Sequence, residues 1–86
     1  MSPKTEKPMA LGIGSDVLYV LDGGPCKGQN RPAKVVQTFG PEVVNLQVFI
    51  DGANDGYHGP AGLVWQTSIK HDSEKAPGTW HWPEEE

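Results

Sequence analysis

The sequence is poor in cysteine, with Cys26 the only one among 86 residues. No intramolecular disulfide can form, whereas small exported domains usually depend on several. The first residues, MSPKTEKPMALGIGSD, contain no apolar stretch of the length that a signal peptide needs. No run approaches the roughly 20 apolar residues of a membrane span. These absences predict a soluble protein of a reducing cytoplasm that has no membrane partner.

Basic residues are also few. Seven Lys and Arg stand against 11 Asp and Glu, and the formal net charge is −4. Proteins that bind nucleic acid by neutralising phosphate present clustered Lys and Arg. The composition therefore argues against nucleic acid as a partner.

Helical periodicity is absent as well, since no window carries apolar residues at helical spacing. Short runs rich in β-forming residues occur instead at 16–21, 33–39, 43–50 and 62–70, between turns rich in Gly and Pro. The alternation is clearest in VVNLQVFI (43–50), where the face expected to be core is formed by Val44, Leu46, Val48 and Ile50. In GLVWQTSIK (62–70), simple alternation predicts one shared face for Leu63, Trp65, Thr67 and Ile69.

These strands predict an all-β fold. Four or five short strands in a core of roughly 60 residues can bury one face only by curling, which favours a small SH3-like or partly open antiparallel β-barrel. Residues 1–14 contain Pro, Lys and Gly without periodicity and are expected to form a flexible arm. The barrel is expected over 15–72, and residues 73–86 to form an irregular tail with an aromatic segment and an acidic end.

Four segments carry a resemblance: RPAKVVQTFG (31–40), VNLQVFIDGANDG (44–56), WQTSI (65–69) and APGTWHWPEE (76–85). In this order they resemble a group of short, functionally unassigned proteins encoded by tailed bacteriophages and prophages. The resemblance covers about residues 16 to 84. It implies a phage origin and a place of work in an infected bacterium, and it brings no catalytic motif with it.

The ten-residue segment GANDGYHGPA (52–61) is long for a hairpin loop, since the commonest hairpins need two to five residues. Its Gly residues, with Asn54 and Asp55, can supply the conformations of tight turns. Tyr57 and His58 at the tip have no such explanation, so we expect the loop to contact a partner or ligand through Asn54, Asp55, Tyr57 and His58. The alternative is that Tyr57 folds back over Trp65. A calcium loop is not expected, because its ligand positions are not filled.

The connection DGGPCKGQNRP (22–32) offers Lys27 and Arg31 for contact with phosphate, although it lacks the Gly-Lys-Ser/Thr ending of a phosphate-binding loop. Cys26 and the three histidines lack the close spacing of zinc ligands, so no metal is predicted. A nucleophilic Cys26 would need a neighbouring base or positive charge, and only Lys27 is adjacent to it in the sequence. We therefore expect no catalytic residues and no cofactor.

The segment TWHW (79–82) places Trp80 and Trp82 on one side of an extended chain and His81 on the other. One interpretation is a fifth strand or strap whose indoles close the open end of the barrel, and this is favoured because so small a core needs the area. The other is an exposed aromatic anchor for a partner.

Two functions follow from these observations. The first is a non-enzymatic phage protein, in the virion or the host cytoplasm, that binds a phage or host protein through its loops and tail. The second is a counter-defence protein that binds a small molecule or nucleotide signal. The base of a nucleotide signal would stack on Tyr57, Trp65 and Trp80, and its phosphates would contact Lys27 and Arg31. Such a site would lie across the interface of a homo-oligomer, if one forms, because one barrel this small has little internal cavity.

Overall fold

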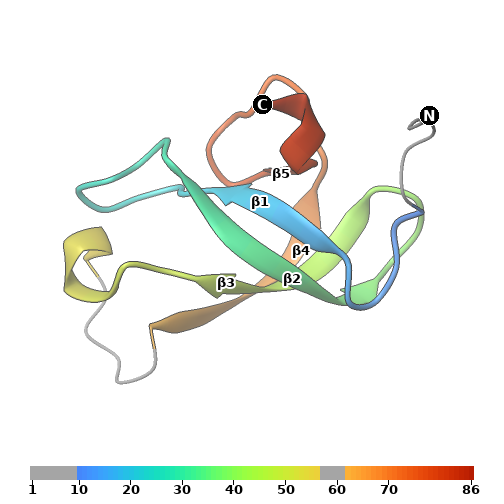
Figure 1. Cartoon of the computed structure of the whole chain (residues 1–86), viewed down its shortest axis with the longest axis horizontal. Coiled ribbons are helices and arrows are strands. Elements are labelled where there is room, and N and C mark those ends of the chain that lie inside the picture. The colour runs from blue at the N-terminus through green and yellow to red at the C-terminus, as the bar shows by residue number, and fades with distance from the viewer. Residues whose placement is uncertain (1–9, 57–61) are drawn as a thin grey trace.

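The computed structural model describes residues 10–56 and 62–86. Within these ranges the chain forms β1 (Asp16–Val20), β2 (Asn30–Thr38), β3 (Val43–Phe49), β4 (Leu63–Lys70) and β5 (Trp80–His81), with two 3-10 turns, η1 (Gly52–Asp55) and η2 (Pro83–Glu85). The strands make one antiparallel sheet in the order β4-β3-β2-β1-β5, which curls into a half-barrel (Figure 1). The predicted all-β, partly open barrel is confirmed.

The core lies on the inner face of the curled sheet. The alternation predicted for β3 is confirmed, because Val44, Leu46 and Val48 are at most 1% exposed, and half-buried Ile50 packs against the cluster. The outward-facing Phe49 is 49% exposed. The rest of the buried apolar cluster comes from all the other strands and their ends: Val17, Tyr19, Leu21, Ala33, Val35, Ile69 and Trp80.

β2 begins three residues before the predicted start, and Pro32 lies inside it. The Val35 N–H donates to the Ser15 carbonyl on the β1 side. Because donors alternate along a strand, the missing N–H of Pro32 falls on the β3 side. The β2–β3 ladder accordingly ends at the pair Ala33 and Val48, and Pro32 pairs only with Leu18 of β1. Pro32 thus limits the ladder without interrupting the strand.

The predicted single face of β4 is wrong, because a β-bulge reverses the alternation. Thr67 and Ser68 together lie opposite Asn45, and Ser68 has a φ of 56°. The Asn45 side-chain oxygen accepts from the Thr67 hydroxyl at 2.8 Å and from the Ser68 N–H at 2.9 Å. Ile69 is therefore buried, whereas Trp65 points outward.

A second irregularity lies in β2 at the same level of the sheet, where the register shifts between Val35 and Gln37. The strand on each side of Asn45 thus carries an additional residue. Bulges increase the local twist of a sheet. Together they explain why so short a sheet curls enough to enclose a core.

The tail and the residues just before β1 pack against the barrel. β5 pairs with β1, and Trp80 also forms a bridge with His71, which follows β4, so that one corner of the half-barrel is closed. The tail thus supplies a strand of the sheet. At the other end, Leu11 packs against the core and the Gly14 N–H donates to the Val35 carbonyl. Residues 1–9 of the predicted arm lie outside the described residues.

Candidate functional site

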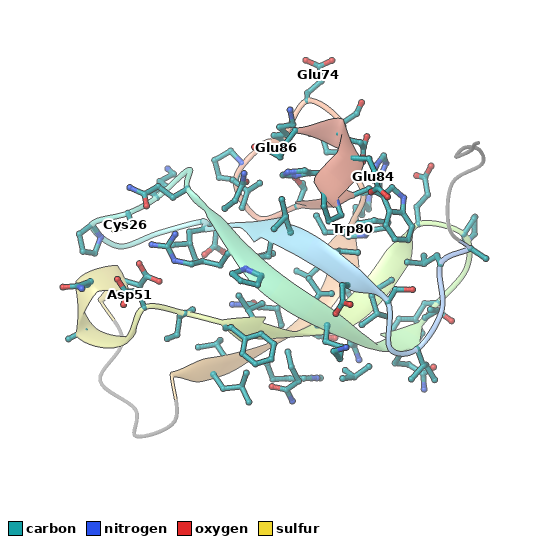
Figure 2. The ribbon with its side chains drawn as sticks, viewed as in Figure 1. Cys26, Asp51, Glu74, Trp80, Glu84 and Glu86 are labelled. Atoms are coloured by element: carbon teal, nitrogen blue, oxygen red, sulfur yellow. The ribbon has the colours of Figure 1, made fainter. Side chains whose placement is uncertain are left out.

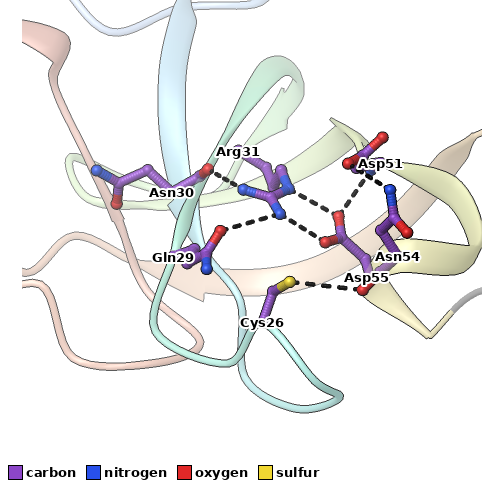
Figure 3. Close-up of polar contacts among 7 residues, drawn as sticks. All are labelled: Cys26, Gln29, Asn30, Arg31, Asp51, Asn54 and Asp55. Carbon is purple, nitrogen blue, oxygen red and sulfur yellow. Dashed lines mark hydrogen bonds and ion pairs between the residues drawn. The ribbon is translucent and has the colours of Figure 1, made fainter.

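The β1–β2 connection and η1 lie side by side at one end of the barrel (Figure 1). An ion pair joins them. Arg31 donates from Nε to Oδ2 of Asp55 at 2.7 Å and from Nη2 to Oδ1 at 2.5 Å, which is a bidentate arrangement (Figure 3). The Asp51 N–H donates to the same Oδ2 at 2.7 Å, and the Asp55 side chain is fully buried. Both oxygens of the Asp55 carboxylate therefore accept hydrogen bonds from within the chain.

The hydrogen bonds from Arg31 hold the pKa of Asp55 well below its ordinary range, and the backbone N–H of Asp51 acts in the same direction. Burial opposes both, because it penalises the charged carboxylate. The pKa of Arg31 is raised, chiefly by its hydrogen bonds with Asp55. Both groups are thus charged at neutral pH, and the pair is a fixed bridge between two loops.

The same two segments approach each other closely through their backbones. A Cβ on Gly24 would lie 2.7 Å from the Asp55 carbonyl oxygen, so only glycine fits there. The Cys26 thiol lies 3.4 Å from the Asn54 carbonyl and donates to it. Close approach, ion pair and thiol contact together dock η1 on the β1–β2 connection.

The structure thus brings together four of the predicted site residues at this end of the barrel. Arg31 and Asp55 bind each other, and the Arg31 guanidinium also contacts the Asn30 carbonyl and the Gln29 side chain. Asn54 and Lys27 are exposed beside them. The predicted residues Tyr57 and His58 lie outside the described residues.

Trp80 of the tail lies away from Cys26 and Asp51, toward the other end of the molecule (Figure 2). Trp80 is 2% exposed and its indole N–H donates to the Glu42 carbonyl at 2.9 Å. Its ring meets the Trp82 ring edge to face, with centroids 5.3 Å apart, and half-buried Trp82 packs against the core. Trp80 therefore occupies the strap position and does not present its ring to a partner.

Two histidine–glutamate pairs fasten the end of the tail. His71 lies 2.8 Å from Glu85, and the fully buried His81 lies 2.6 Å from Glu86. The pKa values of both glutamates are lowered; burial opposes this shift, and the hydrogen bond from the histidine is the largest contribution in its favour. These contacts hold η2 against β1.

A surface that the alternation did not predict lies on the outer face of β3 and β4. Three large apolar side chains gather there: Phe49, Leu63 and Trp65, which are 49%, 42% and 56% exposed. Phe49 lies directly opposite Leu63, and Trp65 lies opposite Gln47, two positions from Phe49 in β3. We call these three residues the apolar patch. The sequence did indicate Phe49 as an outward aromatic of 43–50. It did not indicate that Trp65 lies beside Phe49, because simple alternation without the bulge at Ser68 placed Trp65 on the same face as Ile69.

Metal-ligating side chains do not gather in the residues that the structure describes, where no three of His, Cys, Asp and Glu lie close enough to hold an ion. The helical segments of ranges 10–56 and 62–86 are single 3-10 turns, and none is long and apolar enough to cross a membrane. No family model, no curated protein and no solved structure matches the chain.

Proposed function

We propose that this chain is a non-enzymatic interaction protein of a tailed bacteriophage, and that it binds a phage or host protein through the apolar patch. The observation that carries the proposal is the exposure of Phe49, Leu63 and Trp65 side by side on one rigid face. A buried Trp contributes roughly 150–250 Å² to a core, which a domain this small would gain by enclosing it. Trp65 instead remains exposed beside Phe49 and Leu63, and such a group of exposed apolar side chains is typical of a binding surface.

The proposal moves the binding surface from the loops and tail to the sheet. Trp80 is enclosed and Arg31 is bound to Asp55, so neither is available to a partner. The side chains of the patch stand on paired strands, which fix their positions before binding and lower the entropy lost on association. Phage origin and action in the infected bacterium, in its cytoplasm or in the virion, rest on the resemblance of the four sequence segments.

The alternative, a small-molecule or nucleotide-signal binder, loses two of its expected contacts. Stacking on Trp80 and phosphate contact by Arg31 both require groups that the fold engages. Protein binding needs neither. We therefore favour the protein partner.

The test compares binding by three single variants with binding by the parent. The substitutions Phe49→Ser and Trp65→Ser remove patch side chains, and Phe39→Ser is the matched control, because Phe39 is 55% exposed but lies at the opposite end of β3 beside Val43. Capture from a lysate of phage-infected bacteria identifies the partner, and binding is then measured with the purified partner. A hot-spot residue contributes about 2 kcal/mol or more, which is roughly a 30-fold loss of affinity.

We expect that loss for Phe49→Ser and Trp65→Ser and near-parental binding for Phe39→Ser. Equal binding by all variants, or an equal loss in the control, would contradict the proposal. Thermal melting with a panel of nucleotides tests the alternative on the same preparations. A ligand at 100 times its dissociation constant adds about 2.7 kcal/mol, which would raise the Tm by roughly 10–20 °C, and such a shift would favour the small-molecule function.

A further inference from the structure

β4 stands at the end of the strand order, so one side of its backbone has no neighbouring strand in the described sheet. The Ile50 N–H donates to the Gly62 carbonyl, which makes these two residues a hydrogen-bonded pair. In an antiparallel ladder such pairs alternate with pairs that do not bond each other. The pair Val48 and Val64 is therefore bonded, whereas Leu63 and Trp65 direct their N–H and C=O groups away from β3.

The open part of this edge is short and carries no charge. It runs through Leu63, Val64, Trp65 and Gln66 and ends at the bulge of Thr67 and Ser68. Natural sheets commonly block an edge with Lys, Pro or a bulge, or cover it. Here the bulge limits the edge, but the four residues before it contain no blocking residue. Such a segment is a template for an added strand.

We propose that the added strand is β4 of a second copy of this chain, paired antiparallel about a two-fold axis beside Val64. The proposal rests on the proposed function, since it describes how the apolar patch is presented. The outward backbone groups at Leu63 and Trp65 are placed symmetrically about Val64. In this register each copy's Leu63 lies opposite Trp65 of the other copy, and both pairs exchange two N–H···O=C bonds.

The side chains of this register fit each other on both faces of the sheet. On the outer face, each pair joins an aliphatic to an aromatic side chain, which is a favourable cross-strand combination. On the inner face, the half-buried Val64 of each copy meets Val64 of the other in a non-bonded pair, where side chains approach most closely. No charged residue lies in the paired segment, so this register places no like charges opposite each other.

Strand addition uses the edge and leaves the outer face open. The two sheets become continuous, and the two apolar patches adjoin across the axis. A closed two-fold pairing engages the β4 edge of both copies, so that no further copy can add at β4. The dimer therefore presents one apolar surface made of two patches, which would hold a partner that is itself two-fold or that spans both.

Two double variants test the pairing and its register. Leu63→Lys with Trp65→Lys places Lys opposite Lys across the axis, whereas Leu63→Lys with Trp65→Glu places Lys opposite Glu. Leu63 and Trp65 are both exposed, so both variants keep the barrel core intact. Sedimentation velocity over a concentration series gives the mass of each protein, and thermal melting confirms that each is folded.

We expect a dimer for the parent, at least a tenfold weaker dimer for the Lys–Lys variant, and restored dimerisation for the Lys–Glu variant. A parent that stays monomeric, a Lys–Lys variant that dimerises like the parent, or a Lys–Glu variant no better than Lys–Lys would each overturn the proposal. Phe49→Ser separates the two proposals, because Phe49 lies in β3 and not at the edge. A Phe49→Ser dimer that has lost the protein partner supports both; a monomeric parent that binds through Phe49 overturns the dimer alone.

Discussion

The docking of η1 on the β1–β2 connection predicts a difference between two glycines of that connection. Gly24 and Gly28 have φ values of 79° and 92°, so an alanine at either one is strained by its backbone conformation alone. That strain costs about 1–2 kcal/mol. A Cβ at position 28 meets nothing within 4 Å, whereas a Cβ at position 24 would lie 2.7 Å from the Asp55 carbonyl oxygen.

Gly24→Ala therefore carries a second cost that Gly28→Ala does not. The clash is with backbone, which cannot rotate away, so relieving it requires η1 to move off the connection. Overpacking of this kind costs about 1–3 kcal/mol. We expect Gly28→Ala to lower the free energy of unfolding by about 1–2 kcal/mol and Gly24→Ala by about 2–5 kcal/mol.

Urea denaturation followed by the fluorescence of the three tryptophans measures both free energies under one protocol. Gly28→Ala is the matched control, because it shares the loop, the substitution and the left-handed conformation. If the two variants agree within about 0.5 kcal/mol, the close approach of the two segments does not contribute to stability and the reasoning is refuted.

Two further predictions concern the core and the ion pair. Leu46→Ala should lower the free energy of unfolding by about 2–5 kcal/mol, because Leu46 is completely buried, whereas the neighbouring Gln47→Ala should change it little; urea midpoints that coincide would contradict the core assignment. The folded-state pKa of Asp55 lies below the ordinary 3.8, so the bond with Arg31 stabilises the fold at neutral pH and this contribution is lost as the pH falls below about 3.8. Asp55→Asn should therefore be less stable than the parent at pH 7 and approach it in acid; melting curves whose separation stays constant from pH 7 to pH 3 would exclude this role.

The strands and their core-facing residues could be predicted where alternation was uninterrupted. β3 contains no bulge, so its side chains alternate regularly and those of Val44, Leu46 and Val48 all point inward. Alternation failed in β4, because the bulge at Thr67 and Ser68 is held by the hydrogen bonds that both residues donate to the Asn45 side-chain oxygen, and Asn45 lies more than twenty residues away in the sequence. A local pattern has no information on such a partner.

The sequence also left the roles of several candidate residues open, for a related reason. Arg31 and Asp55 were each expected to face a ligand, and both suit that role when considered singly. The fold places them against each other across 24 positions, so their charges are satisfied internally. The role of Trp80, in contrast, could be predicted. A core this small needs the buried area of its aromatic side chains, so the sequence favoured a packed Trp80, and Trp80 is 2% exposed.

The bulge at Ser68 divides β4 into a part after it, which packs in the core, and a part before it, which is exposed to solvent. Beyond it, Ile69 must fit the core, so few replacements keep the barrel stable. Before it, Leu63 and Trp65 touch solvent, and their replacement leaves the core packing unchanged. One strand can thus diverge in its first half while its second half is constrained. Under the proposed function, the residues that contact the partner can therefore change without a loss of foldability.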